Sequence, residues 1–144
     1  MAVHLETEYL VGLVGLAVGA VAGFIVAARA GRPGLAPALI LGAGAAHVVL
    51  VPVVEPMREV LFFLYFVAMT AVFVLAIVDV RLWRLGAIVF PLGSIAGYFY
   101  FAFAARQADY VGLAIKVVEL AVIVIAVASF AATRSPALER RSPA

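Results

Sequence analysis

The chain has 144 residues, of which 67% are hydrophobic and 12% are charged, and its mean hydropathy is +1.22. Soluble domains are about 45–50% apolar, so this composition indicates an integral membrane protein. The net charge of +2 does not indicate a nucleic-acid-binding protein, because the basic residues cluster at the ends of apolar segments. The absence of cysteine excludes disulfides, cysteine nucleophiles and cysteine-ligated metal centres.

Five segments are long and apolar enough to cross a bilayer, which takes about 20 helical residues. They cover residues 9–28, 35–54, 60–78, 85–105 and 110–132. The connecting segments are short, so consecutive helices are expected to run antiparallel as neighbours. The sequence therefore predicts an all-α fold, a bundle of five transmembrane helices over residues 1–132. A basic, disordered cytoplasmic tail is expected over 133–144.

The first apolar segment is expected to stay in the membrane, because acidic residues rather than a basic stretch precede it. The distribution of arginine then predicts the orientation of the bundle. With five spans, one side carries Arg29, Arg32, Arg81, Arg84, Arg134, Arg140 and Arg141, and the other carries Arg58 and Arg106. Arginine is enriched on the cytoplasmic side of membrane proteins, so the N-terminus is predicted outside and the C-terminus inside. We expect a multi-pass protein of the cell membrane.

Small residues predict where helices pack closely. Gly12, Gly15, Gly19 and Gly23 fall on one stripe of the first helix and form two overlapping GxxxG patterns. Such stripes let two backbones approach closely in lipid. The favoured interpretation is packing within the chain, and the alternative is a homo-oligomer or a larger membrane complex. A second pair, Gly93 and Gly97, lies in the fourth span close to Pro91, where a kink is expected.

Two charged residues, Lys116 and Glu119, lie well inside the last span. A charge at the centre of a bilayer costs about 2.5–3.5 kcal/mol on insertion scales, so both residues require an explanation. They are three residues apart and therefore share one face of a helix, where they can form an ion pair. The alternative for Lys116 is that its long side chain reaches the membrane surface.

Other polar residues are predicted at a similar depth. At a rise of about 1.5 Å per residue, Lys116 and His47 lie roughly 9 Å from the outer end of their spans, and Glu119 about 13 Å. Tyr65, Tyr98 and Tyr100 lie about 8–11 Å deep. These six residues form a predicted polar layer in the outer half of the bilayer and are candidates for binding a ligand or a proton. The alternative for Lys116 and Glu119 is a structural ion pair. The alternative for His47 is a hydrogen-bonded packing residue, and for the three tyrosines it is a place at the membrane interface.

The expected chemistry excludes several classes of protein. His47 is the only histidine expected within the membrane, which disfavours haem held by two histidines. No zinc-ligand spacing, nucleotide-binding glycine motif or Ser/His/Asp constellation is present, so no metal and no cofactor is predicted. Thr70 and Ser94 are expected to bond backbone carbonyls of their own helices.

The sequence favours a non-enzymatic membrane protein that acts as a small membrane subunit or ligand-binding module. The alternative is a small oligomeric transporter or proton-conducting protein in which Glu119 is the titrating carrier. The sequence predicts the lipid bilayer as a partner. An oligomer or a larger membrane complex through the glycine stripe is a further possible partner. The identity of any small ligand does not follow from the residues.

Overall fold

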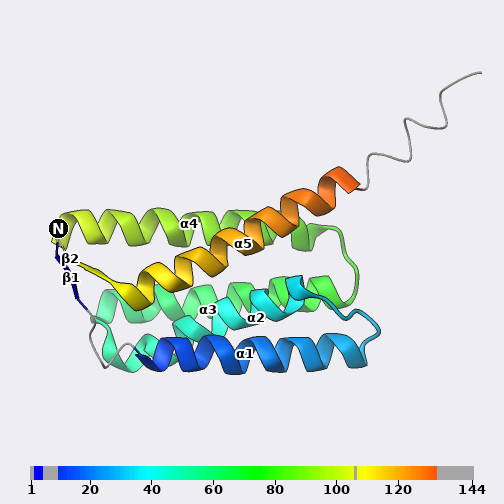
Figure 1. Cartoon of the computed structure of the whole chain (residues 1–144), viewed down its shortest axis with the longest axis horizontal. Helices are drawn as coiled ribbons and strands as arrows, with labels where there is room; N and C mark the ends of the chain where they lie inside the picture. Colours follow the sequence, from blue (N-terminus) through cyan, green and yellow to red (C-terminus); the bar gives the residue numbers. More distant parts are fainter. Residues whose placement is uncertain (1, 5–9, 106, 133–144) are drawn as a thin grey trace, which may run out of the picture.

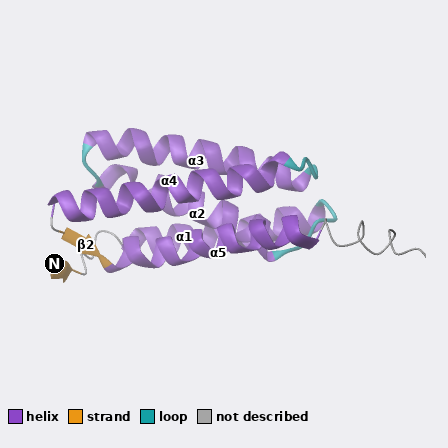
Figure 2. Cartoon of the chain, turned by 90° about the horizontal axis from the view of Figure 1, so that it is seen from above, coloured by secondary structure: helices purple, strands orange, loops and turns teal. Residues whose placement is uncertain are grey.

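The computed structural model describes residues 2–4, 10–105 and 107–132. Its long helices are α1 (Leu10–Arg29), α2 (Leu35–Leu50), α3 (Pro56–Ile77), α4 (Leu82–Ala105) and α5 (Tyr110–Ala132). A short 3₁₀ helix, η2 (Val51–Val53), continues α2. These five helices are long and apolar enough to cross a membrane, and all of them extend along the long direction of the molecule, with α5 at an angle to the others (Figure 1, Figure 2). The predicted all-α bundle of five membrane-spanning helices is confirmed.

Prolines account for two of the helix ends. α2 gives way to the 3₁₀ helix at Val51, because Pro52 lacks an amide hydrogen and restricts the residue before it. α3 begins at Pro56, four residues before the predicted span, since proline suits the first position of a helix. Hydropathy detects only the apolar part of this helix, and its first turn carries Arg58 and Glu59.

Two short strands were not predicted. β1 (Ala2–His4) pairs in parallel with β2 (Gln107–Asp109), with Ala2 opposite Gln107 and His4 opposite Asp109. Three-residue strands are too short to produce a periodic pattern in the sequence. The pair joins the start of the chain to the α4–α5 connection (Figure 1). We refer to this end of the bundle, where β1 and β2 lie, as the strand end.

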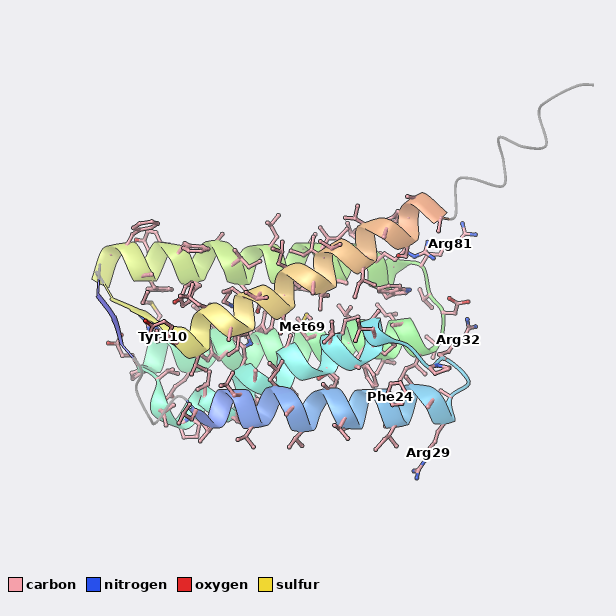
Figure 3. The ribbon with its side chains drawn as sticks, viewed as in Figure 1. Phe24, Arg29, Arg32, Met69, Arg81 and Tyr110 are labelled. Atoms are coloured by element: carbon pink, nitrogen blue, oxygen red, sulfur yellow. The ribbon has the colours of Figure 1, made fainter. Side chains whose placement is uncertain are left out.

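The opposite end carries most of the described arginines. Arg29, Arg32 and Arg81 project there, far from Tyr110 at the strand end (Figure 3). Arg32 forms a half-exposed ion pair with Asp79, with Nη1 and Oδ2 3.0 Å apart. Exposed pairs of this kind add little stability. We call this end the arginine end. The predicted tail at 133–144 and the remaining arginines, at 106, 134, 140 and 141, lie outside the described residues.

The glycine stripe of α1, formed by Gly12, Gly15, Gly19 and Gly23, is buried and packs mainly against α2. A Cβ atom built on Gly19 would lie 2.5 Å from Cβ of Ala45 and 2.9 Å from the carbonyl oxygen of Leu41. A Cβ on Gly23 would lie 2.9 Å from the carbonyl oxygen of Pro37. Close packing within the chain therefore accounts for the stripe. An oligomer through the same stripe, which stays a prediction, would have to displace α2.

The second glycine pair does not pack as the sequence suggested. A Cβ atom on Gly93 or Gly97 would meet no neighbouring atom within 4 Å. α4 is one continuous helix through Pro91, and both glycines line a cavity. The reason is tertiary: α3 lies beside α4 here, but the two helices leave a cavity at this level.

α5 crosses the bundle obliquely (Figure 1) and packs on both α4 and α2. It contributes to two buried apolar clusters. The central cluster, around Met69 (Figure 3), contains Ile40, Ala43, Met69, Val72, Phe73, Ala87, Val122 and Ala126. The strand-end cluster contains Ala46, Leu50, Val111 and Ile115. On α5, Glu119 lies between the two clusters. On α2, His47 follows Ala46 among the positions of the strand-end cluster, and these buried polar residues belong to the site.

Candidate functional site

Four polar side chains from three helices meet inside the bundle. Lys116 and Glu119 come from α5, His47 from α2 and Ser94 from α4. Glu119 is fully buried, and His47 and Lys116 are only 3% and 8% exposed. We call these four residues the buried tetrad. Such a group survives in an apolar interior only if its charges are paired and its polar atoms are hydrogen-bonded.

The serine closes a ring of hydrogen bonds around the ion pair. Lys116 Nζ donates to Glu119 Oε2 over 2.8 Å and to Ser94 Oγ over 2.5 Å. Ser94 Oγ in turn donates its only proton to Glu119 Oε1 over 2.9 Å. Each carboxylate oxygen of Glu119 therefore accepts one hydrogen bond. The ion pair is bridged by a neutral hydroxyl, and the three groups satisfy one another.

The tautomer of His47 follows from its partners. Its Nδ1 lies 2.8 Å from the carbonyl oxygen of Ala43, and because a carbonyl can only accept, Nδ1 carries the proton. Nε2 is then the free acceptor of the ring. It lies 3.5 Å from Lys116 Nζ and 3.4 Å from Ser94 Oγ, at the long end of hydrogen-bonding distance. Since Ser94 donates to Glu119, Lys116 is the donor available to Nε2.

Aromatic contacts hold the imidazole in this orientation. The ring of Phe62 meets it edge to face at 4.9 Å between centroids. The ring of Tyr65 lies at 4.2 Å. Both side chains come from α3, so α3 positions the histidine without belonging to the tetrad.

The start of α5 is anchored to α4 on the strand-end side of the tetrad. Asp109 accepts a hydrogen bond from the backbone N–H of Gly112 through Oδ1, the geometry of a helix N-cap. Tyr98 of α4 donates its hydroxyl to the backbone carbonyl of Asp109 over 3.0 Å. A Cβ atom on Gly112 would lie 2.5 Å from the Tyr98 ring. Capping and close approach together set the position from which Lys116 enters the site.

A cavity of about 370 Å³ lies beside the tetrad, between α3 and α4, and reaches toward the strand end. Small-ligand pockets in proteins are typically about 300–1,000 Å³, so this volume can hold a small ligand. Its polar lining consists of His47, Arg58, Tyr65, Ser94, Tyr98, Asp109 and Lys116. The remaining lining is apolar or glycine.

The cavity reaches the outer surface of the bundle. Leu61 and Leu64 of α3 and Phe90 of α4 line it, and they are 48%, 56% and 42% exposed. Side chains that border both the cavity and the surface mark an opening between α3 and α4. In a bilayer this flank faces the acyl chains. Glu119 does not border the cavity; Lys116 and Ser94, which do, bind its carboxylate.

The three predicted tyrosines occupy different environments. Tyr65 lines the cavity, and its buried hydroxyl lies close to Glu119. Among the described residues, this hydroxyl has no partner in hydrogen-bonding geometry. Tyr98 also lines the cavity, next to the α5 cap. Tyr100 is 69% exposed and does not line the cavity, because it points to another face of α4.

The structure thus brings together five of the six predicted layer residues: His47, Tyr65, Tyr98, Lys116 and Glu119. Ser94 was missed as a site residue, because a serine inside a membrane helix usually bonds its own backbone. Its depth was the available signal: about 16 Å from the end of its helix, within one turn of Glu119. Arg58 was counted only for orientation; its guanidinium stacks 4.9 Å from the Phe101 ring centroid.

The donor set suits hydrogen bonding rather than metal binding. No group of three or more His, Cys, Asp or Glu side chains comes together anywhere in the described part of the chain. The tetrad can bind the polar end of a ligand or redistribute protons among its members. No family model, curated protein or solved structure matches this chain.

Proposed function

We propose that the protein is a membrane-embedded binding module for a small amphipathic molecule taken up from the lipid phase. The observation that supports this most strongly is the cavity between α3 and α4, with mostly apolar walls and the buried tetrad at its side. An amphipathic ligand would leave its apolar part against α3 and α4 and present its polar part to the tetrad. A small-subunit role is compatible with this proposal, since a subunit can hold a ligand for a larger complex.

We further propose the orientation suggested by the arginines in the cell membrane. The strand end then lies outside, and the cavity and the buried tetrad occupy the outer half of the bilayer. Arg29, Arg32, Arg81 and Arg84 near the arginine end support this orientation.

Transport is the second candidate, and one observation favours it. Glu119 is a fully buried carboxylate hydrogen-bonded to groups that line a cavity, which is the arrangement expected of a proton carrier. However, the apolar central cluster fills the bundle on the arginine side of Glu119, so a path across the membrane requires a second conformation. In proteoliposomes, transport predicts a flux that Glu119→Gln abolishes, whereas a binding module produces none.

The binding proposal is tested by photolabelling in lipid vesicles with an uncharged alkyl probe that carries a diazirine. We expect peptides of α3 and α4 that line the cavity to be labelled above the other lipid-facing segments. Ala68→Phe, which adds a ring at a lining position, should reduce this labelling several-fold. Val67→Phe is the matched control, because Val67 is 47% exposed and does not line the cavity.

Labelling spread evenly over all five helices, or equal labelling in both variants, would contradict the proposal. Size-exclusion chromatography in detergent checks separately whether Ala68→Phe folds. A folded variant elutes as a monodisperse species, and a misfolded one elutes as an aggregate.

A further inference from the structure

We propose that the cavity selects an uncharged amphipath whose head group accepts hydrogen bonds, such as a lipophilic ketone, ester or quinone, with the Tyr65 hydroxyl as its main donor. This inference rests on the proposed binding function and specifies the class of ligand. It follows from the hydrogen-bond donors at the cavity, its charge balance and the character of its walls.

The first argument is an excess of hydrogen-bond donors. The Tyr65 side chain lines the cavity, and its hydroxyl is buried beside Glu119 without a partner in hydrogen-bonding geometry among the described residues, so a rotation of this side chain would present it to a ligand. A buried polar group without a partner costs about 1–3 kcal/mol, which a ligand oxygen could recover. Lys116 has a second incompletely used donor, because its contact with His47 Nε2 is 3.5 Å long. Both donors can therefore bind an acceptor atom of a ligand.

The acceptors of the tetrad, by contrast, are largely engaged. Glu119 accepts from Lys116 at one oxygen and from Ser94 at the other. Ser94 accepts from Lys116. A head group that only donates would find His47 Nε2 as the acceptor of the tetrad without a short contact, whereas an acceptor can bind the Tyr65 hydroxyl without breaking a short contact.

The second argument is charge. Lys116 is neutralised by Glu119 at 2.8 Å, and the other two charged side chains of the lining, Arg58 and Asp109, have opposite signs. A carboxylate, phosphate or ammonium head would therefore bring an uncompensated charge into an apolar enclosure, which is costly. A neutral head avoids this cost. The site differs in this respect from anion-binding pockets, where basic groups are in excess.

The third argument is access. The lining residues Leu61, Leu64 and Phe90 are partly exposed on the flank of the bundle, so a ligand can enter from the membrane and keep its apolar part along α3 and α4. Molecules that dissolve in the bilayer and carry one neutral polar head use this route without leaving the lipid.

The test is competition against the diazirine probe by four compounds that share one alkyl chain. One ends in a methyl ketone, one in a carboxylate, one in a trimethylammonium group and one in a plain methyl group. In the wild-type protein, we expect the ketone to compete at least about three-fold better than the other three. The factor corresponds to the lower part of the range for one hydrogen bond.

Tyr65→Phe removes the hydroxyl alone and should abolish the advantage of the ketone over the plain alkane. Tyr100→Phe is the matched control, because Tyr100 is on the exposed face of α4 and away from the cavity. It should leave the ketone advantage unchanged. Both variants keep an aromatic ring, so each is expected to fold.

The outcomes separate the two proposals. If no compound competes and labelling is not confined to α3 and α4, the binding function itself is wrong. If all four compounds compete equally, the cavity binds apolar chains without distinguishing their head groups, and the inference about the head group is wrong. If a charged compound competes best, or if the ketone advantage persists in Tyr65→Phe, the inference about the head group is overturned while the binding function stands.

Discussion

At the scale of single residues, the ion pair of Lys116 and Glu119 is the costliest feature of the chain. The two groups are tolerated because each is the partner of the other and Ser94 links them. Removing one member leaves a buried charge unpaired, which typically costs about 3–5 kcal/mol. Replacing both members by apolar residues removes that penalty. The stability of the fold therefore depends on leaving no buried charge unpaired, and not on the net strength of the ion pair.

Lys116→Leu and Glu119→Leu are each expected to lower the free energy of unfolding by about 3–5 kcal/mol. The double variant should recover most of this loss, since no charge remains unpaired. The measurement is a double-mutant cycle of equilibrium unfolding in mixed micelles. Additive losses in the double variant would show that the two side chains do not depend on each other.

The serine bridge can be tested in the same way. Ser94→Ala removes a donor to Glu119 and an acceptor for Lys116, so a loss of about 1–3 kcal/mol is expected. Thr70→Val is the control on α3, where the buried hydroxyl has no hydrogen-bond partner among the described residues. Removing an unsatisfied hydroxyl should be neutral or slightly stabilising. Equal effects of the two changes would argue against a bridging role for Ser94.

At the scale of elements, the close packing of α1 on α2 depends on the absence of a Cβ atom at the glycines of the stripe. Three of the four stripe glycines, Gly15, Gly19 and Gly23, approach backbone atoms of α2, which cannot rotate away as a long side chain can. This packing holds α2 in place, and α2 carries His47 into the site. The stripe therefore supports the tetrad indirectly.

Gly19→Ala is expected to destabilise the bundle by about 1–3 kcal/mol, because its methyl group would overlap Ala45 and the Leu41 carbonyl. Gly93→Ala makes the same chemical change where a Cβ meets nothing within 4 Å. It should be neutral or slightly stabilising, since alanine favours the helix. Thermal unfolding in detergent distinguishes the two. Equal melting temperatures would contradict the close packing of α1 on α2.

The N-cap of α5 offers a second test at this scale. Asp109→Ala removes the acceptor for the Gly112 N–H and is expected to cost about 1 kcal/mol. Asp109→Asn keeps an acceptor oxygen and should retain most of the stability. The same unfolding measurement applies, and an asparagine variant as unstable as the alanine variant would show that the charge, and not the cap, matters at this position.

At the scale of the whole molecule, the two ends of the bundle differ in chemistry. Toward the strand end the cavity is lined by Arg58 and Asp109, and the arginine end holds the Arg32–Asp79 pair. The proposed orientation exposes the strand end to the outside. A ligand arriving through the outer leaflet would then meet the opening between α3 and α4.

The absence of cysteine allows this orientation to be measured directly. Met57→Cys at the strand end, where Met57 is 61% exposed, should react with a membrane-impermeant thiol reagent on intact cells. Gly34→Cys at the arginine end should react only after permeabilisation. Its backbone is extended, so cysteine is tolerated there. The reverse pattern would place the cavity in the cytoplasmic half of the membrane.

The sequence by itself was sufficient for five helices long and apolar enough to cross a membrane and for the position of the charged pair along the last of them. Both are local properties: apolar length follows from the residues of each segment, and position follows from counting along a helix. Hydropathy also located α1 and α5 to within about one residue, because short polar or capped connections bound them.

The tertiary structure alone decided which polar residues meet. Tyr65 and Tyr100 were predicted at the same depth, yet Tyr65 faces the cavity and Tyr100 faces outward. Depth fixes height in the membrane, whereas the direction of a side chain around the bundle depends on how each helix is rotated against its neighbours. That rotation is set by contacts between distant segments, such as the oblique crossing of α5 over α2 and α4 (Figure 1). For the same reason, the bridging role of Ser94 depends on how α4 is rotated against α5.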